Sequence, residues 1–164
     1  MEKSIVSVSF VCLGNICRSP LAQGVFEDLL EREGLLEKVM VSSAGVGNWH
    51  VGAEPDARMQ KTAKARGIVM RSRAQQIQAS DFRQLDLVLA MDQSNMDALM
   101  HTARTDAERE KLKMFRSFDP EANGDLDVPD PYYGGDKGFD LVFNIVHRTC
   151  PKILQYLRQH YSFL

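Results

Sequence analysis

Residues 5–34 of this 164-residue chain read IVSVSFVCLGNICRSPLAQGVFEDLLEREG, and they decide the fold. Residues 5–11 are rich in Val, Ile and Phe, which predicts a buried strand. The apolar residues that follow have the spacing of an amphipathic helix: Leu21, Val25, Phe26, Leu29 and Leu30. Ser19 is a suitable N-cap, Pro20 a suitable first helical residue, and Gly34 stands where such a helix should end. The stretch therefore predicts a strand, a tight loop and a helix.

The same alternation continues along the chain. It predicts strands at 39–44, 86–91 and 111–115, and helices at 55–66, 92–101, 105–110 and 138–161. Ser80 should cap a short helical turn, and Pro151 should kink or split the last helix because it removes a backbone donor. Residues 116–137 hold three prolines and are read as one long functional loop. The pattern predicts a single α/β domain over residues 1–164: a doubly wound, flavodoxin-like three-layer α/β/α fold with a four-stranded parallel sheet.

Composition and charge exclude several classes of partner. Hydrophobic residues make up 44% of the chain and charged residues 26%, as in soluble globular proteins. The formal net charge is −2 and no lysine-rich block is present, so no nucleic-acid partner is expected. The longest apolar run, residues 5–13, is too short to span a bilayer, and no signal-peptide pattern opens the chain, so no membrane partner is expected. Three cysteines cannot all pair, which predicts a reducing, cytoplasmic location.

The loop CLGNICRS, residues 12–19, can surround one tetrahedral dianion, because a short loop that leads into a helix points its backbone N–H groups inward. Phosphate or a similar oxyanion should therefore bind at Leu13, Gly14, Asn15, Ile16, Cys17 and Ser19. Arg18 adds a planar fork that meets two phosphate oxygens. The same positive field should lower the pKa of Cys12 and make it a nucleophile, with the Ser19 hydroxyl stabilising its thiolate.

Two other readings of this loop are weaker. The plainest is a buried cysteine beside a helix cap and a surface arginine, but too many features coincide around Cys12 for that. A zinc site is disfavoured because Cys12 and Cys17 lack ligand spacing. The histidines also form no partner pair: His50, His101, His147 and His160. We therefore expect no metal and no cofactor.

At these residues the sequence resembles the low molecular weight protein tyrosine phosphatases, whose loop reads Cys, five residues, Arg and Ser or Thr near the N-terminus. The resemblance covers nearly the whole chain and includes three further motifs: SSAG at 42–45, AMDQSN at 90–95 and DPYYG at 130–134. It implies a metal-independent hydrolase whose partners are phosphotyrosine-containing proteins, acting as a monomer or weak homodimer. The implied reaction passes through a cysteinyl-phosphate at Cys12, with Arg18 binding the phosphate.

The resemblance also implies a general acid, Asp130, which precedes Pro-Tyr-Tyr. It would protonate the departing tyrosine and then activate water against the cysteinyl-phosphate. Asp-Pro is also common turn chemistry, and Asp125 and Asp127 are the alternative acids. Residues 119–130 resemble a calcium-binding loop as well, but Glu121 stands where Asp or Asn belongs and Asp130 where a bidentate Glu belongs.

Supporting roles follow from the same resemblance. Asn15 and Ser43 should hold the loop in its tight curl, and Asp92 should fix the Arg18 guanidinium while capping the helix that it opens. Many relatives have a histidine near the position of Ser72, so one supporting bond is expected to differ in this chain.

The choice of substrate should depend on residues at the mouth of the pocket. Trp49, Tyr132 and Tyr133 match positions where relatives flank the substrate ring, which favours an aryl phosphate. Relatives that cleave phosphoarginine tend to carry Thr in place of Ile16 and to lack the Tyr-Tyr pair. Similar enzymes close a reversible disulfide between the nucleophile and the cysteine that corresponds to Cys17.

Two alternative functions are disfavoured. Thioredoxin-linked arsenate reductases need two more cysteines after the third strand, and this chain has none between Cys17 and Cys150, which we expect in the core. A catalytically silent phosphate-binding module or adaptor would have no reason to keep Cys12, Arg18 and Asp130 together.

Overall fold

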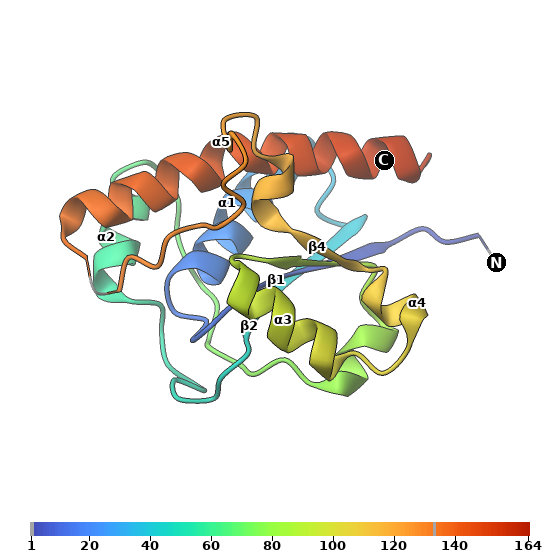
Figure 1. Ribbon diagram of the computed structural model, residues 1–164. Helices are drawn as coiled ribbons and strands as arrows, with labels where there is room; N and C mark the ends of the chain where they lie inside the picture. The colour runs from blue at the N-terminus through green and yellow to red at the C-terminus, as the bar shows by residue number, and fades with distance from the viewer. Residues whose placement is uncertain (1, 133) are drawn as a thin grey trace.

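The computed structural model describes residues 2–132 and 134–164, and a four-stranded parallel sheet lies at its centre (Figure 1). The strands stand in the order β2-β1-β3-β4, with bounds β1 Val6–Cys12, β2 Val39–Gly45, β3 Leu87–Ala90 and β4 Leu112–Met114. The helices are α1 Arg18–Arg32, α2 Ala57–Lys64, α3 Gln93–Thr102, α4 Asp106–Arg109 and α5 Asp136–His160, with 3-10 turns at Ala79–Arg83 and Phe115–Phe118. The predicted α/β fold with its four-stranded parallel sheet is confirmed.

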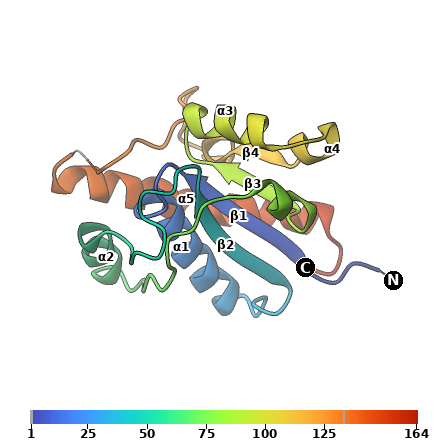
Figure 2. The same ribbon diagram turned by 90° about the horizontal axis from the view of Figure 1, so that it is seen from below.

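Two apolar clusters attach the helices to the sheet. α1 and α5 lie over one face, where the Phe10 ring of β1 packs edge-on against Phe26 of α1, with 5.7 Å between the ring centroids (Figure 2). α3 lies over the other face, where Leu99 packs with Val11 and Val88. Because both faces are covered, the central strands β1 and β3 are buried along nearly their whole length, and the residues that interrupt the apolar ones in β1 are small serines.

The start of α1 differs from the sequence-based prediction. The helix begins at Arg18 with Cys17 as its N-cap, so Ser19 lies inside the first turn and does not cap it. The Ser19 hydroxyl instead lies 3.0 Å from the sulfur of Cys12. The residue expected to end the helix, Gly34, has a φ of 70°, as a C-terminal glycine should.

The expected cap at Ser80 is wrong, and of the two outcomes expected at Pro151 the split does not occur. Gln78, not Ser80, caps the 3-10 turn, because Gln78 and Asp81 exchange hydrogen bonds there. α5 runs through Pro151 without a break, so the helix is not split. A proline inside a helix costs about 3 kcal/mol, whereas each buried aliphatic side chain contributes about 1.5–3 kcal/mol. The buried face of α5 around Ile153 therefore outweighs the lost backbone bond.

The sheet brings the strand ends to one edge. Cys12 at the end of β1 pairs in register with Gly45 at the end of β2, and the Met91 N–H after β3 donates to the Val11 carbonyl at 3.0 Å. The loops that follow these strands therefore open on the same side, where parallel sheets bind ligands. No helix within residues 2–132 and 134–164 has both the length and the apolar character that a membrane span requires.

Candidate active site

The loop between β1 and α1 curls tightly because two backbone positions permit it. Asn15 has a φ of 57°, a left-handed conformation that Asn tolerates better than most residues. Gly45 of β2 packs directly against the curl, where a Cβ atom would stand 2.7 Å from the Leu13 carbonyl oxygen. The Gly47 N–H donates to that same carbonyl at 2.9 Å. The neighbouring strand therefore shapes the loop together with the loop's own sequence.

Cys12 lies at the base of the loop with 3% of its surface exposed. Its sulfur lies 3.0 Å from the Ser19 hydroxyl and accepts from the Asn15 N–H at 3.3 Å. The sulfur also lies beside the start of α1, where unpaired backbone N–H groups favour negative charge. The surroundings of Cys12 therefore suit an anionic nucleophile or an oxyanion.

Asn15 joins the loop to β2 through a chain of hydrogen bonds with a fixed polarity. Its Oδ1 accepts from the Gln75 N–H at 3.0 Å. Its Nδ2 therefore donates to Ser19 Oγ at 2.7 Å and to Ser43 Oγ at 3.0 Å. Ser43 donates its own proton to Gln23 Oε1 at 2.6 Å. Because Ser19 Oγ accepts from the amide, its own proton has two acceptors in reach, the cysteine sulfur at 3.0 Å and the Ala44 carbonyl at 3.4 Å, and the sulfur is the nearer.

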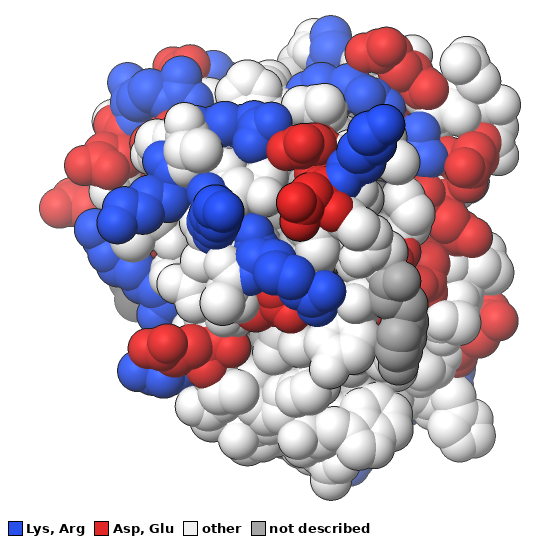
Figure 3. All heavy atoms as spheres, turned by 90° about the vertical axis from the view of Figure 1, so that its left-hand side faces the viewer, with Lys and Arg blue, Asp and Glu red and all other residues white. Residues whose placement is uncertain are grey.

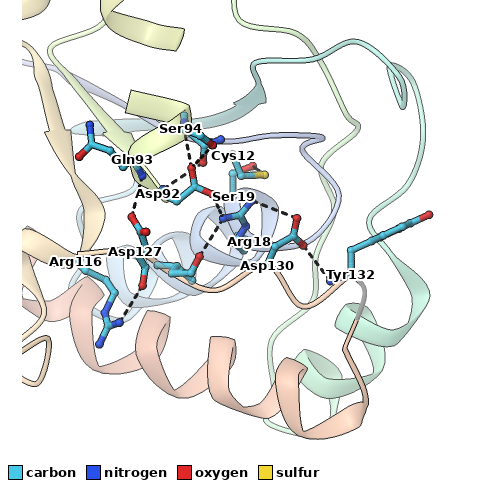
Figure 4. A network of polar contacts seen from close by, with 12 residues as sticks. Cys12, Arg18, Ser19, Asp92, Gln93, Ser94, Arg116, Asp127, Asp130 and Tyr132 are labelled. Atoms are coloured by element: carbon cyan, nitrogen blue, oxygen red, sulfur yellow. Dashed lines mark hydrogen bonds and ion pairs between the residues drawn. The ribbon is translucent and has the colours of Figure 1, made fainter. Parts of the chain in front are cut away.

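Arg18 is 2% exposed, and its guanidinium is held from several sides. Nη1 donates to Asp92 Oδ2 at 2.6 Å and to the Val128 carbonyl at 3.0 Å, and Nη2 lies 3.6 Å from Asp130 Oδ2 (Figure 4). Burial lowers the pKa of Arg18, but the negative charges of Cys12, Asp92 and Asp130 raise it above its usual value on balance. The guanidinium is therefore a permanent cation in the floor of the site.

Asp92 makes both of the contacts expected for it. Its Oδ2 accepts from Arg18, while its Oδ1 accepts from the Asn95 N–H at 2.8 Å and so caps α3. Burial raises the pKa of Asp92, but the bonds from Arg18, Asn95 and Ser94 lower it below its usual value on balance. One charged carboxylate thus couples the start of α3 to the loop arginine.

Asp130 reaches the site from the long loop before α5. The loop is attached to the sheet at Val128, whose N–H donates to the Met91 carbonyl at 2.7 Å. Asp130 Oδ1 accepts from the Tyr132 N–H at 3.0 Å, and its Oδ2 faces Arg18 (Figure 4). The structure thus places this carboxylate over the same loop as the cysteine.

The other acids of this loop point elsewhere. Asp127 accepts from the Gln93 N–H at 2.8 Å, and Asp125 lies 3.4 Å from Arg116, so neither lines the cavity beside the cysteine. Asp119, the first residue of the calcium-like stretch, accepts from the guanidinium of Arg116. Within residues 2–132 and 134–164, no three His, Cys, Asp or Glu side chains are placed to share a metal ion.

A cavity of about 320 Å³ opens over the loop. Its lining residues are Cys12, Leu13, Gly14, Ile16, Cys17, Arg18, Trp49, His50, Asp130 and Tyr132. At its mouth, Trp49 is 70% exposed, and the rings of His50 and Tyr132 lie 6.4 Å apart. A cationic floor below aromatic walls fits a phosphate carried on an aromatic ring. Tyr133, the third predicted wall residue, lies outside the described residues.

The other two cysteines are not activated. Burial raises the pKa of Cys17 well above its usual value, and the negative charges of Asp56, Cys12 and Asp130 raise it further. Burial alone raises the pKa of Cys150, which lies in the apolar core as predicted. Cys12 is therefore the one cysteine of the chain whose polar partners can support a thiolate.

Three site residues were not singled out from the sequence as functional: Gln23, Gln75 and His50. Gln75 Nε2 donates to the Ser43 carbonyl at 2.9 Å, in addition to its backbone bond with Asn15. Among the described residues, Ser72 makes no side-chain hydrogen bond to this network, and the two glutamines support it instead. No motif marks them, because only the folded chain brings them to the loop.

The chain was compared with known proteins. Residues 7–162 match the family model described as low molecular weight phosphotyrosine protein phosphatase. A low molecular weight protein-tyrosine-phosphatase of Streptomyces coelicolor is 43% identical over 153 residues, 93% of each chain. A crystal structure of a protein tyrosine phosphatase from Entamoeba histolytica superposes with a TM-score of 0.90 at 35% identity, covering 94% of this chain and 98% of that one. A Drosophila arginine phosphatase superposes with a TM-score of 0.85 at 34% identity, covering 92% and 97%.

Proposed function

The chain belongs to the low molecular weight phosphotyrosine protein phosphatase family and is a protein-tyrosine phosphatase, and we propose that Cys12, Arg18 and Asp130 carry out its reaction. The observation that supports these roles is that all three side chains line one cavity, with Asp130 3.6 Å from the Arg18 guanidinium. The substrate phosphate would accept from the loop N–H groups, and Arg18 would donate to two of its oxygens.

The first step is a displacement at phosphorus. The Cys12 thiolate attacks the phosphate, a sulfur–phosphorus bond forms, and the bond from phosphorus to the tyrosine oxygen breaks. A phenolate is a poor leaving group, so the protonated Asp130 carboxyl gives its proton to that oxygen. Arg18 and the loop N–H groups stabilise the charge that develops on the phosphate oxygens.

The second step reverses the roles. The Asp130 carboxylate accepts a proton from water, the water oxygen attacks phosphorus, and the sulfur–phosphorus bond breaks. Inorganic phosphate leaves, and Cys12 returns to the thiolate with Asp130 protonated again. The Ser19 hydroxyl, 3.0 Å from the sulfur, donates to the thiolate as it is released.

Positioning residues complete the site. Asn15 and Ser43 keep the loop curled, and Asp92 sets the orientation of the Arg18 fork. The loop N–H groups of Leu13 to Ser19 would bind the phosphate without contributing to specificity. The specificity for tyrosine would then come from the walls, where Trp49 and Tyr132 offer faces to an aromatic ring.

Phosphoarginine is the competing substrate, since an arginine phosphatase is among the similar structures. Ile16 lines the cavity with an apolar side chain that offers no hydrogen bond to a guanidinium. An aryl phosphate suits such a wall better, because its ring needs no hydrogen bonds there and the burial of its apolar surface is favourable. The experiment is a metal-free assay of the purified protein with phosphotyrosine, phosphoserine, phosphoarginine and arsenate. Turnover of phosphotyrosine far above the others supports the proposal, and a preference for phosphoarginine or reduction of arsenate contradicts it.

We propose a cytoplasmic location because all three cysteines are thiols, including the proposed nucleophile, which an oxidising compartment would inactivate. A regulatory disulfide between Cys12 and Cys17 stays a prediction. The two residues line the same cavity, so the loop could close such a bond without a partner protein.

A further inference from the structure

Basic residues gather beside the cavity. Residues 57–80 contain six of the 20 basic residues of the chain and none of its 22 acidic ones, although the net charge of the whole chain is −2. These six are Arg58, Lys61, Lys64, Arg66, Arg71 and Arg73. Figure 3 faces the side of the molecule where α2 and the start of α5 lie, and it shows Lys and Arg side chains gathered across this side. Although the net charge of the chain is negative, residues 57–80 therefore contribute a locally positive surface.

α2 carries the part of this surface with the clearest geometry. Met59 and Ala63 are the buried residues of α2, so the opposite side of the helix faces solvent. Lys61 stands midway between them in sequence and thus at the centre of the exposed side. Arg58 and Lys64 flank it at three-residue spacing, which makes them neighbours on a helix surface. We call Arg58, Lys61 and Lys64 the basic row.

Arg58 and Arg66 already have partners, whereas Lys61 and Lys64 have no acidic partner among the described residues. Arg58 and Arg66 each make an ion pair at 2.9 Å with an aspartate, and their guanidinium groups lie 4.8 and 4.9 Å from the ring centroids of Phe139 and Phe143 of α5. Lys61 and Lys64 are exposed and make no ion pair with any acidic residue that the structure describes. Two positive charges therefore stand free on the solvent side of α2.

The basic row begins at the wall of the cavity. Arg58 donates to the Tyr132 carbonyl at 3.2 Å and lies 5.5 Å from the centroid of the Tyr132 ring. From Arg58 to Lys64 the helix rises about 9 Å at about 1.5 Å per residue. An extended peptide covers that length with about three residues. A polypeptide whose tyrosine occupies the cavity can therefore lay its next residues along the row.

We propose that the basic row binds an acidic segment next to the phosphotyrosine of the substrate protein. This inference rests on the proposed function, because it requires phosphotyrosine in the cavity. Charge complementarity selects the partner: Asp or Glu side chains a few residues from the phosphotyrosine would pair with Lys61 and Lys64. An anionic membrane fits less well, because membrane-binding clusters usually hold about four to eight basic residues, whereas the basic row holds three, and Arg58 among them is already paired with Asp56.

The test compares two phosphotyrosine peptides that differ only in their flanks. One carries three Glu residues on each side of the phosphotyrosine, and the other carries Gln at the same positions. The readout is the ratio of kcat/KM for the acidic peptide to kcat/KM for the neutral peptide, which cancels any general change in the enzyme. We expect the ratio to fall by about five- to tenfold in Lys61→Gln/Lys64→Gln, the size expected for two exposed ion pairs. The wild-type ratio should also fall as salt is added.

A matched control removes two other positive charges. Arg104→Gln/Lys152→Gln changes the net charge by the same amount, and its residues lie before α4 and in the C-terminal half of α5, far from α2 (Figure 1). We expect this variant to keep the wild-type ratio. If both double variants lower the ratio equally, the effect is one of net charge and the basic row is not the docking surface.

The remaining outcomes are equally decisive. A wild-type ratio of one, with both peptides hydrolysed, overturns the docking inference and leaves the proposed function intact. Hydrolysis of neither peptide contradicts the proposed function, and the inference fails with it. Sedimentation with phosphatidylcholine vesicles, with and without phosphatidylserine, tests the other partner. Binding to the phosphatidylserine vesicles that Lys61→Gln/Lys64→Gln abolishes, together with a peptide ratio of one, would assign the row to a membrane instead.

Discussion

Ser43 of β2 donates its hydroxyl proton to Gln23 of α1 at 2.6 Å and accepts from the side-chain amide of Asn15. A strand residue and a helix residue therefore together set the direction of the hydrogen bonds that hold the phosphate loop, residues 12–19. Ser43→Ala would leave a buried amide donor of Asn15 without its acceptor. The cost of such a loss is about 1–3 kcal/mol. We expect the free energy of unfolding to fall by about that amount, measured by urea denaturation, with a lower kcat/KM for an aryl phosphate.

Ser42→Ala is the matched control for this prediction, because Ser42 directly precedes Ser43 in β2 and its side chain points to the opposite face of the sheet. It should change the free energy of unfolding and kcat/KM far less. Equal effects of the two substitutions would mean that Ser43 has no special part in holding the loop. Gln23→Met should resemble Ser43→Ala in direction, since it removes the acceptor of the Ser43 proton.

Gly45→Ala should disrupt the phosphate loop from the neighbouring strand. Its new Cβ would stand 2.7 Å from the Leu13 carbonyl oxygen, a backbone atom that cannot turn aside. We expect a large loss of kcat/KM and of phosphate affinity, measured through the fluorescence of Trp49, the one tryptophan of the chain. Gly135→Ala is the control, because a Cβ there meets no atom of the described residues within 4 Å. Wild-type phosphate affinity in Gly45→Ala would show that the loop does not need this close approach.

Asp130→Ala should slow the enzyme in proportion to how poor the leaving group is. A positioned general acid contributes about 10²–10⁴-fold, and we expect a loss in this range for phosphotyrosine peptides. Cleavage of an activated ester such as p-nitrophenyl phosphate should lose less in its first step, since nitrophenolate leaves without a proton. Pre-steady-state release of the leaving group measures that step. Equal losses for both substrates would remove Asp130 from the role of acid.

Cys12→Ser should abolish turnover but leave oxyanion binding. A serine hydroxyl is a far weaker nucleophile at neutral pH than a thiolate, and we expect a loss on the order of 10⁵-fold or more in kcat. Phosphate should still change the Trp49 fluorescence of the variant, because the loop N–H groups and Arg18 remain. Retained hydrolysis would exclude Cys12 as the nucleophile. Loss of phosphate binding would show that the substitution had altered the loop itself.

Asp119 should contribute to stability in a pH-dependent way. Its side chain is fully buried, and burial alone would raise its pKa. Hydrogen bonds from Arg148, the Glu121 N–H and Arg116 outweigh burial and lower the pKa of Asp119 to about 2. Because the pKa is lower in the folded state than in the unfolded one, the contribution is present above pH ~4 and is lost as the pH falls toward ~2. Asp119→Asn should lower the free energy of unfolding by about 2 kcal/mol at pH 7. Denaturant titrations should show that difference shrinking below pH ~4; a constant difference would contradict the assignment.

The sequence predicts those parts of the fold and site that local pattern controls. The run of Val, Ile and Phe before Cys12, the spacing of apolar residues after Pro20 and the positive φ at Gly34 all report local requirements of strand, helix and helix end. The sequence also predicts the two contacts of Asp92, with Arg18 and with the start of α3, because its place before a helix and its motif both indicate them.

Other features depend on contacts between distant segments, and the sequence did not predict them. Ser19 is a residue type that often caps helices, but its hydroxyl instead lies 3.0 Å from the sulfur of Cys12 at the end of β1. Cys17 therefore occupies the N-cap position of α1. Gln23 and Gln75 approach the loop from a helix and from a segment some sixty residues away, with no spacing that marks them. The helix continues through Pro151 because burial of the apolar face of α5 outweighs the backbone bond that proline removes, and a rule for proline alone does not include that face.

The covalent phosphoryl-cysteine proposed at Cys12 can be trapped and identified. Asp130→Ala should form the intermediate quickly from p-nitrophenyl phosphate, because that leaving group needs no proton from an acid. The variant should hydrolyse the intermediate slowly, because it lacks the base that activates water. Rapid acid quenching followed by peptide mass spectrometry should then find phosphate on the peptide that contains Cys12 and on the sulfur of that residue. Phosphate on another residue, or turnover with no phosphorylated peptide at any quench time, would contradict the mechanism.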